Sequence, residues 1–324
     1  MRAVRFDQTG GPDVLRLEDV PTPTPGPGEI LIRHEAIGVN FIDTYMRSGL
    51  YPLALPSGLG QEGAGVVTAV GDGVTRFRVG DRAAYAMGAA DAYADCKVVA
   101  EVRAVRVPDG VEARTAAAVL LKGMTAEFLL RRLYPLQAGQ TVLLHAAAGG
   151  VGQIMVQWAK AIGAEIIATV GSVAKAEKAH ALGADHVVLY RDQDVAAEVR
   201  RITGGRGVAV AYDSVGKDTF EGTLASIGRR GMFVSFGNAS GPPPPVEAQR
   251  LSRAGSLFFT RPTLADYIAS TEELDASAAA VFDMVASDSL TIEIGQTFPL
   301  SQAADAHRAL EGRRTIGATL LIPE

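Results

Sequence analysis

Residues 141–152 read TVLLHAAAGGVG, in which an apolar strand runs into a glycine turn that opens a helix. A glycine turn lets the backbone approach phosphate oxygens, and the free N–H groups and dipole of the following helix attract the anion. The match to the G-x-G-x-x-G pattern is imperfect, because Ala147 stands where the first glycine would be. Taken alone, the turn fits either a diphosphate site or a strand-to-helix connection without a ligand.

The segments that follow this turn favour the ligand-binding interpretation. Apolar runs alternate with helical patterns from Thr141 to Thr260. The expected order is strand 141–145, helix 151–162, strand 165–170, helix 174–182, strand 186–189, helix 195–202, strand 208–213, helix 220–227, strand 232–236 and strand 257–260. This alternation predicts βαβ units and a doubly wound parallel sheet whose first strand carries the glycine turn.

The sequence on either side of the predicted sheet has a different pattern. Short strands are expected at 29–34, 64–70 and 82–86, separated by glycine and proline turns, and they predict a compact, mainly β domain. After Pro262 the pattern predicts a helix at 264–286, a strand at 291–298, a helix at 301–310 and a strand at 318–322. We expect this tail to return to the first domain, so that the parallel sheet is inserted between two pieces.

The composition limits the classes of protein. One cysteine among 324 residues excludes an internal disulfide and any site built from several thiolates, which fits a reducing compartment. The formal net charge of −5 gives no positive field, which disfavours a nucleic-acid binder.

The N-terminal residues lack the apolar stretch and cleavage site of a secretory signal, so we expect a cytoplasmic protein. Residues 133–159 contain no Asp, Glu, Lys or Arg and are long enough to span a membrane. Pro135 and several Gln and Gly residues in this stretch argue against a span.

The residues after the second expected strand bear on the choice of dinucleotide. An NAD enzyme usually places Asp or Glu there to accept a hydrogen bond from the ribose 2′-hydroxyl. Residues 168–175 read ATVGSVAK, with no carboxylate but with Ser172 and Lys175. A hydroxyl and a lysine suit a 2′-phosphate, so the sequence favours NADPH. Lys175 and Lys178 also fit the solvated face of a helix, and the missing acid is therefore the stronger argument.

Residues 60–65, GQEGAG, raise the question of a metal. They look like the Gly-His-Glu segment of medium-chain alcohol dehydrogenases, whose histidine binds zinc, but Gln61 stands at the histidine position. Asn40 stands where those enzymes have an early cysteine. Cys96 and five scattered histidines show no zinc-ligand spacing. We predict no zinc, with Cys96 as a partly buried filler and the histidines as surface or capping residues.

Several segments together carry a resemblance to a known family. They are residues 36–45 (AIGVNFIDTY), 47–52 (RSGLYP), 55–60 (LPSGLG), 145–152 (HAAAGGVG), 212–216 (YDSVG) and 234–238 (VSFGN). Together they resemble the zinc-independent quinone oxidoreductases of the zeta-crystallin-like branch of the medium-chain dehydrogenase/reductase superfamily. Ala147 and the missing zinc ligands are typical of this branch.

The resemblance implies an α/β fold in which a doubly wound parallel sheet, the Rossmann domain, is inserted in a mainly β GroES-like catalytic domain. The expected ranges are 1–122 and 263–324 for the catalytic domain and 123–262 for the NADP(H)-binding domain. The resemblance also implies a homodimer in which the cofactor domains extend a sheet across the interface. Strand 257–260 is the expected contact, although burial of this strand within one chain would fit equally well.

The resemblance further assigns residues to the cofactor. Lys175, Tyr190 and Arg313 match the residues that surround the 2′-phosphate in the family, with Arg314 as an alternative to Arg313. Gly149, Gly150 and Val151 would face the diphosphate, while Ser214, Gly237 and Asn238 would line the adenosine and ribose. Ser172 and Thr125 complete the expected cofactor-binding set.

On the substrate side, the family places residues matching Asn40, Asp43, Tyr45 and Tyr51 near the nicotinamide, with Gln61 and Thr125 close by. These first four are the expected catalytic residues. The two tyrosines are the best polar candidates, because a phenol offers a flat apolar face and a hydrogen-bond donor. Without the resemblance, packing on the domain surface would be their simpler role.

The activity implied by the resemblance is NADPH-dependent reduction of a quinone. An electron-poor quinone ring needs less Lewis-acid help than an ordinary carbonyl, so hydride transfer from NADPH is feasible without zinc. We expect Tyr45, Tyr51 or Asn40 to hydrogen-bond the developing oxyanion, and water or a tyrosine to supply the proton. Two alternatives stay open: an NADPH-dependent enone or enoyl reductase, and a cofactor-sensing nucleic-acid-binding protein, which the acidic charge disfavours.

Overall fold

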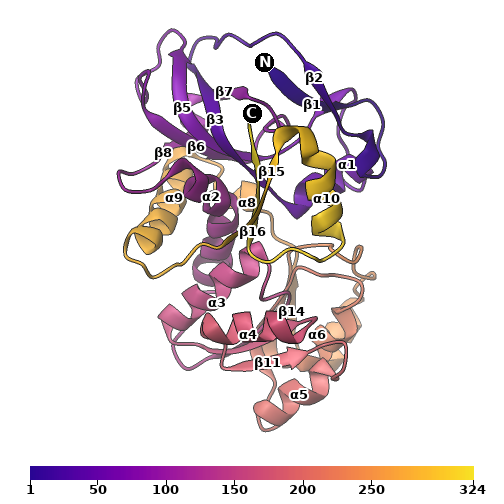
Figure 1. The fold of residues 1–324 in the computed structure, drawn as a ribbon. Coiled ribbons are helices and arrows are strands. Elements are labelled where there is room, and N and C mark those ends of the chain that lie inside the picture. The colour runs from indigo at the N-terminus through magenta and orange to yellow at the C-terminus, as the bar shows by residue number, and fades with distance from the viewer. The chain divides into compact units, whose positions relative to one another are not determined.

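The computed structural model describes all residues, 1–324, which form two compact units. One unit comprises Met1–Met124 and Ile268–Glu324, and the other comprises Thr125–Tyr267. In Figure 1 the indigo strands of the N-terminal segment and the yellow elements of the C-terminal segment belong to the first unit. The chain therefore leaves this unit once and returns to it.

The first unit is mainly β. Its strands are β1 (Arg2–Phe6), β2 (Arg16–Asp19), β3 (Glu29–Val39), β4 (Ser57–Gly58), β5 (Glu62–Val70), β6 (Arg82–Ala86), β7 (Cys96–Ala100), β8 (Ala104–Arg106), β15 (Ile294–Pro299) and β16 (Ala318–Ile322). Its helices are α1 (Phe41–Ser48), α9 (Thr271–Ala286) and α10 (Ala303–Glu311), with short 3-10 turns at Pro12–Val14, Glu101–Arg103 and Leu300–Gln302. Helix α2 (Ala113–Glu127) runs from the first unit into the second.

The pairing of β16 explains why the chain returns. The strand order of the larger sheet is β15-β16-β3-β5-β6-β8, with β7 also paired to β3. Leu320 in β16 lies opposite Gly38 in β3 in an antiparallel register. The C-terminal strand thus completes a sheet that begins near the N-terminus, and a separate sheet has the order β2-β1-β4.

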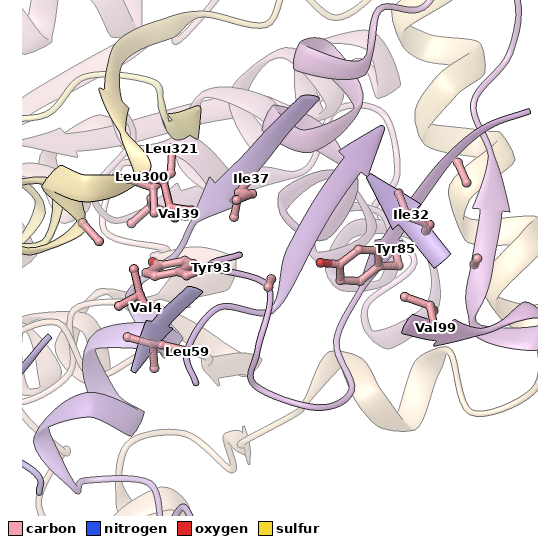
Figure 2. Packing of buried hydrophobic residues seen from close by; sticks show 14 of the residues in the cluster. Val4, Ile32, Ile37, Val39, Leu59, Tyr85, Tyr93, Val99, Leu300 and Leu321 are labelled. Carbon is pink, nitrogen blue, oxygen red and sulfur yellow. The ribbon is translucent and has the colours of Figure 1, made fainter. Parts of the chain in front are cut away.

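The core of the first unit draws on both pieces of the chain. Figure 2 shows part of this cluster, with Ile32 and Tyr85 from the N-terminal strands and Leu300 and Leu321 from the C-terminal segment. All four side chains are almost fully buried. Because burial of each such side chain contributes about 1.5–3 kcal/mol, the C-terminal segment is part of the stabilising core.

The second unit contains a parallel sheet with helices. Its strands are β9 (Thr141–Leu144), β10 (Glu165–Val170), β11 (His186–Leu189), β12 (Val208–Asp213), β13 (Ile227–Ser235) and β14 (Phe258–Thr260). Its helices are α3 (Gly150–Ile162), α4 (Val173–Ala181), α5 (Val195–Ile202), α6 (Phe220–Ser226), α7 (Ala248–Arg253) and α8 (Leu264–Tyr267), with a π-helical segment at Phe128–Leu133.

All pairings in this sheet are parallel, and the strand order is β11-β10-β9-β12-β13-β14. The order reverses direction between β9 and β12, which is the point where doubly wound sheets bind ligands at their carboxyl ends. The predicted doubly wound sheet is therefore confirmed. Its core includes Leu143, Ile167, Ala211 and Phe233, one from each of four adjacent strands.

Two expectations about individual elements were wrong. The single helix expected at 264–286 is two helices, because Ser270 begins α9 as an N-cap: its hydroxyl accepts from the N–H of Glu273, and its own N–H donates to the Glu273 carboxylate. The strand expected at 29–34 continues to Val39, since its second half pairs with both β5 and β16. None of the helices combines the length and apolar character needed to cross a membrane.

Candidate functional site

The glycine turn leads from β9 into α3. Ala146 adopts a left-handed conformation (φ 53°), and Gly149 is the N-cap of α3 without a side-chain cap. A Cβ at Gly152 would lie 2.3 Å from the carbonyl oxygen of Ala146, so only glycine allows the turn and helix to pack this closely. The first turn of α3 carries no acidic side chain, so its N–H groups suit an anion. Gly149, Gly150 and Val151 are all half-buried at this helix start.

The end of β10 lies beside the end of β11. Ser172 is the exposed N-cap of α4, and Lys175 follows in its first turn. A Cβ on Gly171 would lie 2.6 Å from the Tyr190 hydroxyl and 3.4 Å from Nε of Arg191. The structure therefore brings Tyr190 to the Ser172–Lys175 segment. It also adds Arg191, which the sequence analysis missed although it directly follows Tyr190.

The ends of β12 and β13 also meet. The Asp213 carboxylate accepts hydrogen bonds from the N–H groups of Val215 (2.8 Å) and Gly216 (3.0 Å), which shapes the turn that holds Ser214. A Cβ on Gly237 would lie 2.3 Å from the carbonyl oxygen of Ser214. Gly237 and the buried Asn238 are therefore in close contact with the Ser214 turn.

Two expected cofactor residues lie elsewhere in the chain. Thr125 is half-buried in α2, in the second unit. Arg313 is exposed just after α10 in the first unit and adopts a left-handed conformation (φ 55°), followed by the exposed Arg314.

The candidate catalytic residues gather around α1. Asn40 is its N-cap, and the Asn40 N–H donates to Oδ2 of Asp43 at 2.8 Å. The Asn40 side chain donates to Glu62 Oε2 at 3.0 Å, and Glu62 forms a buried ion pair with Lys122, also at 3.0 Å. Asn40 is thus fixed through both its backbone and its amide. Neither Glu62 nor Lys122 was predicted as a site residue from the sequence.

The two candidate tyrosines contact each other. Tyr45 is buried in α1, Tyr51 is half-buried just beyond it, and their ring centroids lie 5.3 Å apart in an edge-on arrangement. The N–H of Tyr51 donates to the carbonyl of Tyr45 at 3.0 Å. Gln61 is buried nearby, with its amide 3.5 Å from the sulfur of Met46. Asn40, Asp43, Tyr45 and Tyr51 therefore form one local cluster.

The expectation that every histidine is a surface or capping residue was wrong. His34, His145 and His307 are each no more than 3% exposed. The Nδ1 of His34 lies 2.7 Å from the Ala94 carbonyl, and its Nε2 lies 2.8 Å from the Tyr85 hydroxyl. Burial lowers the pKa of all three histidines, to about 4 for His34 and about 3 for His307, so they are neutral near pH 7.

Comparison with known proteins gives the whole chain a context. The family described as "Alcohol dehydrogenase GroES-like domain" matches residues 26–132, and "Zinc-binding dehydrogenase" matches residues 150–287. A quinone oxidoreductase of Pseudomonas aeruginosa is 51% identical over 99% of both chains. The chain belongs to the quinone oxidoreductase family.

Two further relatives are similar to the chain over its whole length. The crystal structure of Escherichia coli quinone oxidoreductase complexed with NADPH is 45% identical, covers 100% of both chains and superposes with a TM-score of 0.98. A 2-haloacrylate reductase of a Burkholderia species is 43% identical over 99% of both chains. The mainly β first unit is accordingly a GroES-like domain, and the second is a Rossmann domain.

Zinc does not fit the residues of this protein. No group of three or more His, Cys, Asp and Glu side chains is arranged to hold a metal ion. At the two positions discussed above, the Asn40 amide donates to Glu62 and the Gln61 amide lies against Met46. Neither side chain offers the thiolate or imidazole that a catalytic zinc site uses.

NADPH does fit the residues of the second unit. Gly152 and Gly237 each stand where a Cβ would collide with backbone, so the helix start and the strand ends pack closely together at the turns that such a cofactor needs. Ser172, Lys175, Tyr190 and Arg191 supply hydroxyl and cationic groups at the ends of β10 and β11, and no carboxylate directly follows β10. This donor set suits the extra phosphate that distinguishes NADPH from NADH.

Proposed function

We propose that this protein is an NADPH-dependent quinone reductase that works without zinc. The observation that carries the proposal is the full-length similarity, at 45% identity, to a quinone oxidoreductase whose structure contains NADPH. The reaction takes one hydride and one proton to a quinone and yields a hydroquinone and NADP⁺.

The Rossmann domain would hold the cofactor. The N–H groups of Gly149, Gly150 and Val151 would face the diphosphate, with the α3 dipole behind them. Lys175, Tyr190 and Ser172 would contact the 2′-phosphate, and the family resemblance adds Arg313 to this set. Ser214, Gly237, Asn238 and Thr125 would complete the cofactor contacts. This proposal is supported by the close backbone packing at Gly152 and Gly237 and by the absence of a carboxylate directly after β10.

The α1 cluster would bind the quinone. Bound NADPH supplies the hydride from C4 of its nicotinamide. Tyr45 and Tyr51 would lie against the quinone ring, and a phenol hydroxyl or the Asn40 amide would hydrogen-bond the oxygen on which negative charge develops. Fixed donors stabilise that charge without reorganising during the reaction. Asn40 is held by its bonds to Asp43 and Glu62, and the second N–H of its amide, which has only a 3.4 Å contact with the Gly38 carbonyl, would be the donor.

A second candidate activity is reduction of an activated C=C bond. It is favoured by the 43% identity to a 2-haloacrylate reductase. The chemistry is closely related, because a hydride reaches an electron-poor carbon and a carbonyl oxygen or carboxylate takes up charge in both cases. The two activities would share the same cofactor site and the same α1 cluster.

We also propose that the protein is a cytoplasmic homodimer. Strand β14 lies at the edge of the six-stranded sheet, and its Phe258 side chain is 59% exposed. An exposed, apolar edge strand is suited to pair with a second copy of itself. Pairing of two β14 strands would join the sheets of the two subunits.

A cofactor-by-acceptor activity matrix tests the function. NADPH and NADH would each be combined with a small quinone, 2-chloroacrylate, an unsaturated ketone and an unsaturated acyl thioester. We expect the highest kcat/KM with NADPH and the quinone. A higher kcat/KM with 2-chloroacrylate or the ketone would replace the first proposal with the second, and no oxidation of NADPH by any acceptor would overturn both.

A further inference from the structure

A buried chain of hydrogen bonds ends on Asp43. The Tyr93 hydroxyl lies 2.9 Å from Oδ2 of Asp43 and 3.0 Å from Nε2 of His307. On the other side of this ring, Nη1 of Arg47 lies 3.0 Å from Nδ1 of His307. All four side chains are at most 2% exposed, and Figure 2 shows Tyr93 within the hydrophobic cluster of the unit.

The hydrogen bonds of this buried chain all run in one direction. Arginine can only donate, so Nδ1 of His307 must accept from Arg47. Burial and the neighbouring Arg47 charge lower the pKa of His307 to about 3, so the ring is neutral and its one proton is on Nε2. That proton can only point to the Tyr93 oxygen, and the Tyr93 proton is then donated to Asp43. Each donor points from the Arg47 cation toward the carboxyl group.

The outer end of the chain is anchored near the surface. Arg47 makes a bidentate ion pair with Glu311 of α10, at 2.5 and 3.2 Å, and its Nε donates to the Gly10 carbonyl. Arg47 therefore has a fixed position although its guanidinium lies inside the domain. A buried charge needs such fixed partners.

The two oxygens of Asp43 differ. Oδ2 accepts from both Tyr93 and the Asn40 N–H, whereas Oδ1 is buried and accepts no hydrogen bond. Burial raises the pKa of Asp43 to about 7, against the opposing effect of the bonds from Asn40 and Tyr93. Hydrogen bonds to the charged form are about twice as strong as those to a neutral acceptor. Loss of the Asp43 charge would therefore weaken the hydrogen bond from the Asn40 N–H.

Other charged groups also face Asp43. The charges that act on Asp43 are those of Glu62 of β5 and Lys122 of α2, the neutral groups near it are Tyr85, Tyr93 and His307, and the Arg47–Glu311 ion pair lies at the far end of the hydrogen-bonded chain. Lys122 and Glu62 pair with each other at 3.0 Å, so their opposite charges largely cancel at Asp43. The hydrogen-bonded chain from Arg47 is thus the direct support of the carboxylate.

The position of Asp43 links this chain to the candidate catalytic residues. Asp43 holds the backbone of Asn40 at the start of α1, and Tyr45 follows two residues later on the same helix. We propose that Tyr93, His307 and Arg47 are positioning residues for quinone reduction, which hold Asp43 as a carboxylate and thereby fix Asn40 and Tyr45. This inference rests on the proposed function for its link to activity.

The decisive variant is Tyr93→Phe, with Tyr85→Phe as its matched control. Tyr85 is equally buried in the same core, and its hydroxyl bonds to His34 at 2.8 Å rather than to Asp43. Two readouts are needed: the pKa of Asp43, followed by ¹³C NMR of the carboxyl carbon in the protein without cofactor, and the pH profile of quinone reduction with NADPH.

In Tyr93→Phe the Asp43 pKa should rise by about one unit or more, because a donor to the charged form is lost. The acid limb of kcat should move up by the same amount, so that activity at pH 6 falls about tenfold while activity at pH 9 stays within about twofold of the unaltered protein. Tyr85→Phe should change neither midpoint. If Tyr93→Phe does not fold, the double variant Tyr93→Phe/His307→Leu takes its place with the same expectations. It leaves no histidine N–H without a hydrogen-bond acceptor.

An unchanged Asp43 pKa in Tyr93→Phe would overturn the proposal, as would a raised pKa without a shift of the acid limb, or an equal loss of activity at every pH. Failure of the unaltered protein to reduce any quinone would instead contradict the proposed function. In that case the NMR comparison still decides whether the chain from Arg47 supports the Asp43 charge.

Discussion

Nε2 of His145 lies 2.9 Å from the hydroxyl of Thr223, beneath the strand ends that carry the candidate cofactor residues. The other ring nitrogen lies 2.9 Å from the hydroxyl of Thr169, and Thr223 donates to Asp213 at 2.8 Å. His145 directly precedes the glycine turn, and Asp213 shapes the Ser214 turn. One buried chain therefore ties together the ends of β10, β9 and β12.

Removal of the Thr223 hydroxyl should loosen these strand ends. Thr223→Val keeps the volume but leaves the His145 N–H without its acceptor, so we expect a loss of about 1–3 kcal/mol in the free energy of unfolding. We also expect the Kd for NADPH to rise severalfold, measured by fluorescence titration. Thr203→Val is the control, since this buried hydroxyl lies at the end of α5 and accepts from Gly207. Equal effects of both variants on Kd would contradict the prediction.

The parallel sheet was predictable because its signal is local. Runs such as 165–170, 186–189 and 195–202 are apolar or amphipathic over their whole length, and the structure has β10, β11 and α5 at these bounds. The residues that close the first unit were less predictable. The end of β3, up to Val39, pairs with β5 on one side and with β16, which lies nearly 300 residues later, on the other. No local pattern contains that information.

The buried polar groups were missed for the same reason. Histidines in proteins are usually partly exposed, and a buried histidine needs hydrogen-bond partners for its ring nitrogens. Those partners come from distant segments: Thr223 for His145, and Tyr93 and Arg47 for His307. The candidate site residues came mainly from the family resemblance. The local sequence showed only that no acidic residue follows β10. The hydrogen bond between Asn40 and Glu62 became visible only in the structure.

Lys175→Ala should weaken NADPH binding and leave NADH nearly unchanged. A charge-assisted hydrogen bond contributes about 1.5–3 kcal/mol, so the KM for NADPH should rise about ten- to a hundredfold. Lys178→Ala is the matched control, because it removes the same charge one turn later on α4. Steady-state kinetics with both cofactors measures the difference. Equal losses with NADPH and NADH would remove Lys175 from the phosphate site.

Tyr51→Phe should lower kcat for quinone reduction by about tenfold, with a small effect on KM. Loss of one oxyanion donor can cost about a hundredfold or more, but Tyr45 and Asn40 remain as donors. The ring is kept, so the edge-on contact with Tyr45 is preserved. Tyr134→Phe, at a half-buried tyrosine of the second unit, should leave kcat unchanged. If Tyr51→Phe and Tyr45→Phe both keep the full rate, neither tyrosine is catalytic.

Acidification from pH 7 to pH 5 should destabilise the protein. Burial lowers the pKa of His34 to about 4 and of His307 to about 3, so in this pH range the unfolded chain binds protons that the folded protein does not. Stability from these groups is present at neutral pH and is lost as pH falls, by up to about 1.4 kcal/mol per pH unit for each histidine. Asp43, with its pKa raised to about 7, acts in the opposite direction, but it is one group against three, because burial also lowers the pKa of His145.

Urea unfolding at pH 5, 6 and 7 measures this slope. The double variant His34→Phe/Tyr85→Phe removes one titrating ring together with its hydroxyl partner, but it leaves the Ala94 carbonyl without its donor. Stability at pH 7 should therefore fall by about 1–3 kcal/mol, while the slope with pH becomes shallower. A protein that is equally stable at pH 5 and pH 7 would refute the assignment of His34 and His307 as neutral buried groups.

Phe258→Glu should dissociate the proposed dimer. Phe258 pairs with Met232 of β13 on one side, and β14 has no further strand of its own chain on the other. Two edge strands related by a two-fold axis would bring two added carboxylates close together, and like charges across a strand pair repel. The side chain is already 59% exposed, so the fold of one chain should tolerate the change. Val79→Glu, at a similarly exposed apolar position of the first unit, is the control. Light scattering should give a dimer for the unaltered protein and for Val79→Glu, and a monomer for Phe258→Glu. A dimer in all three proteins would place the interface elsewhere. A monomer in all three would contradict the proposed homodimer.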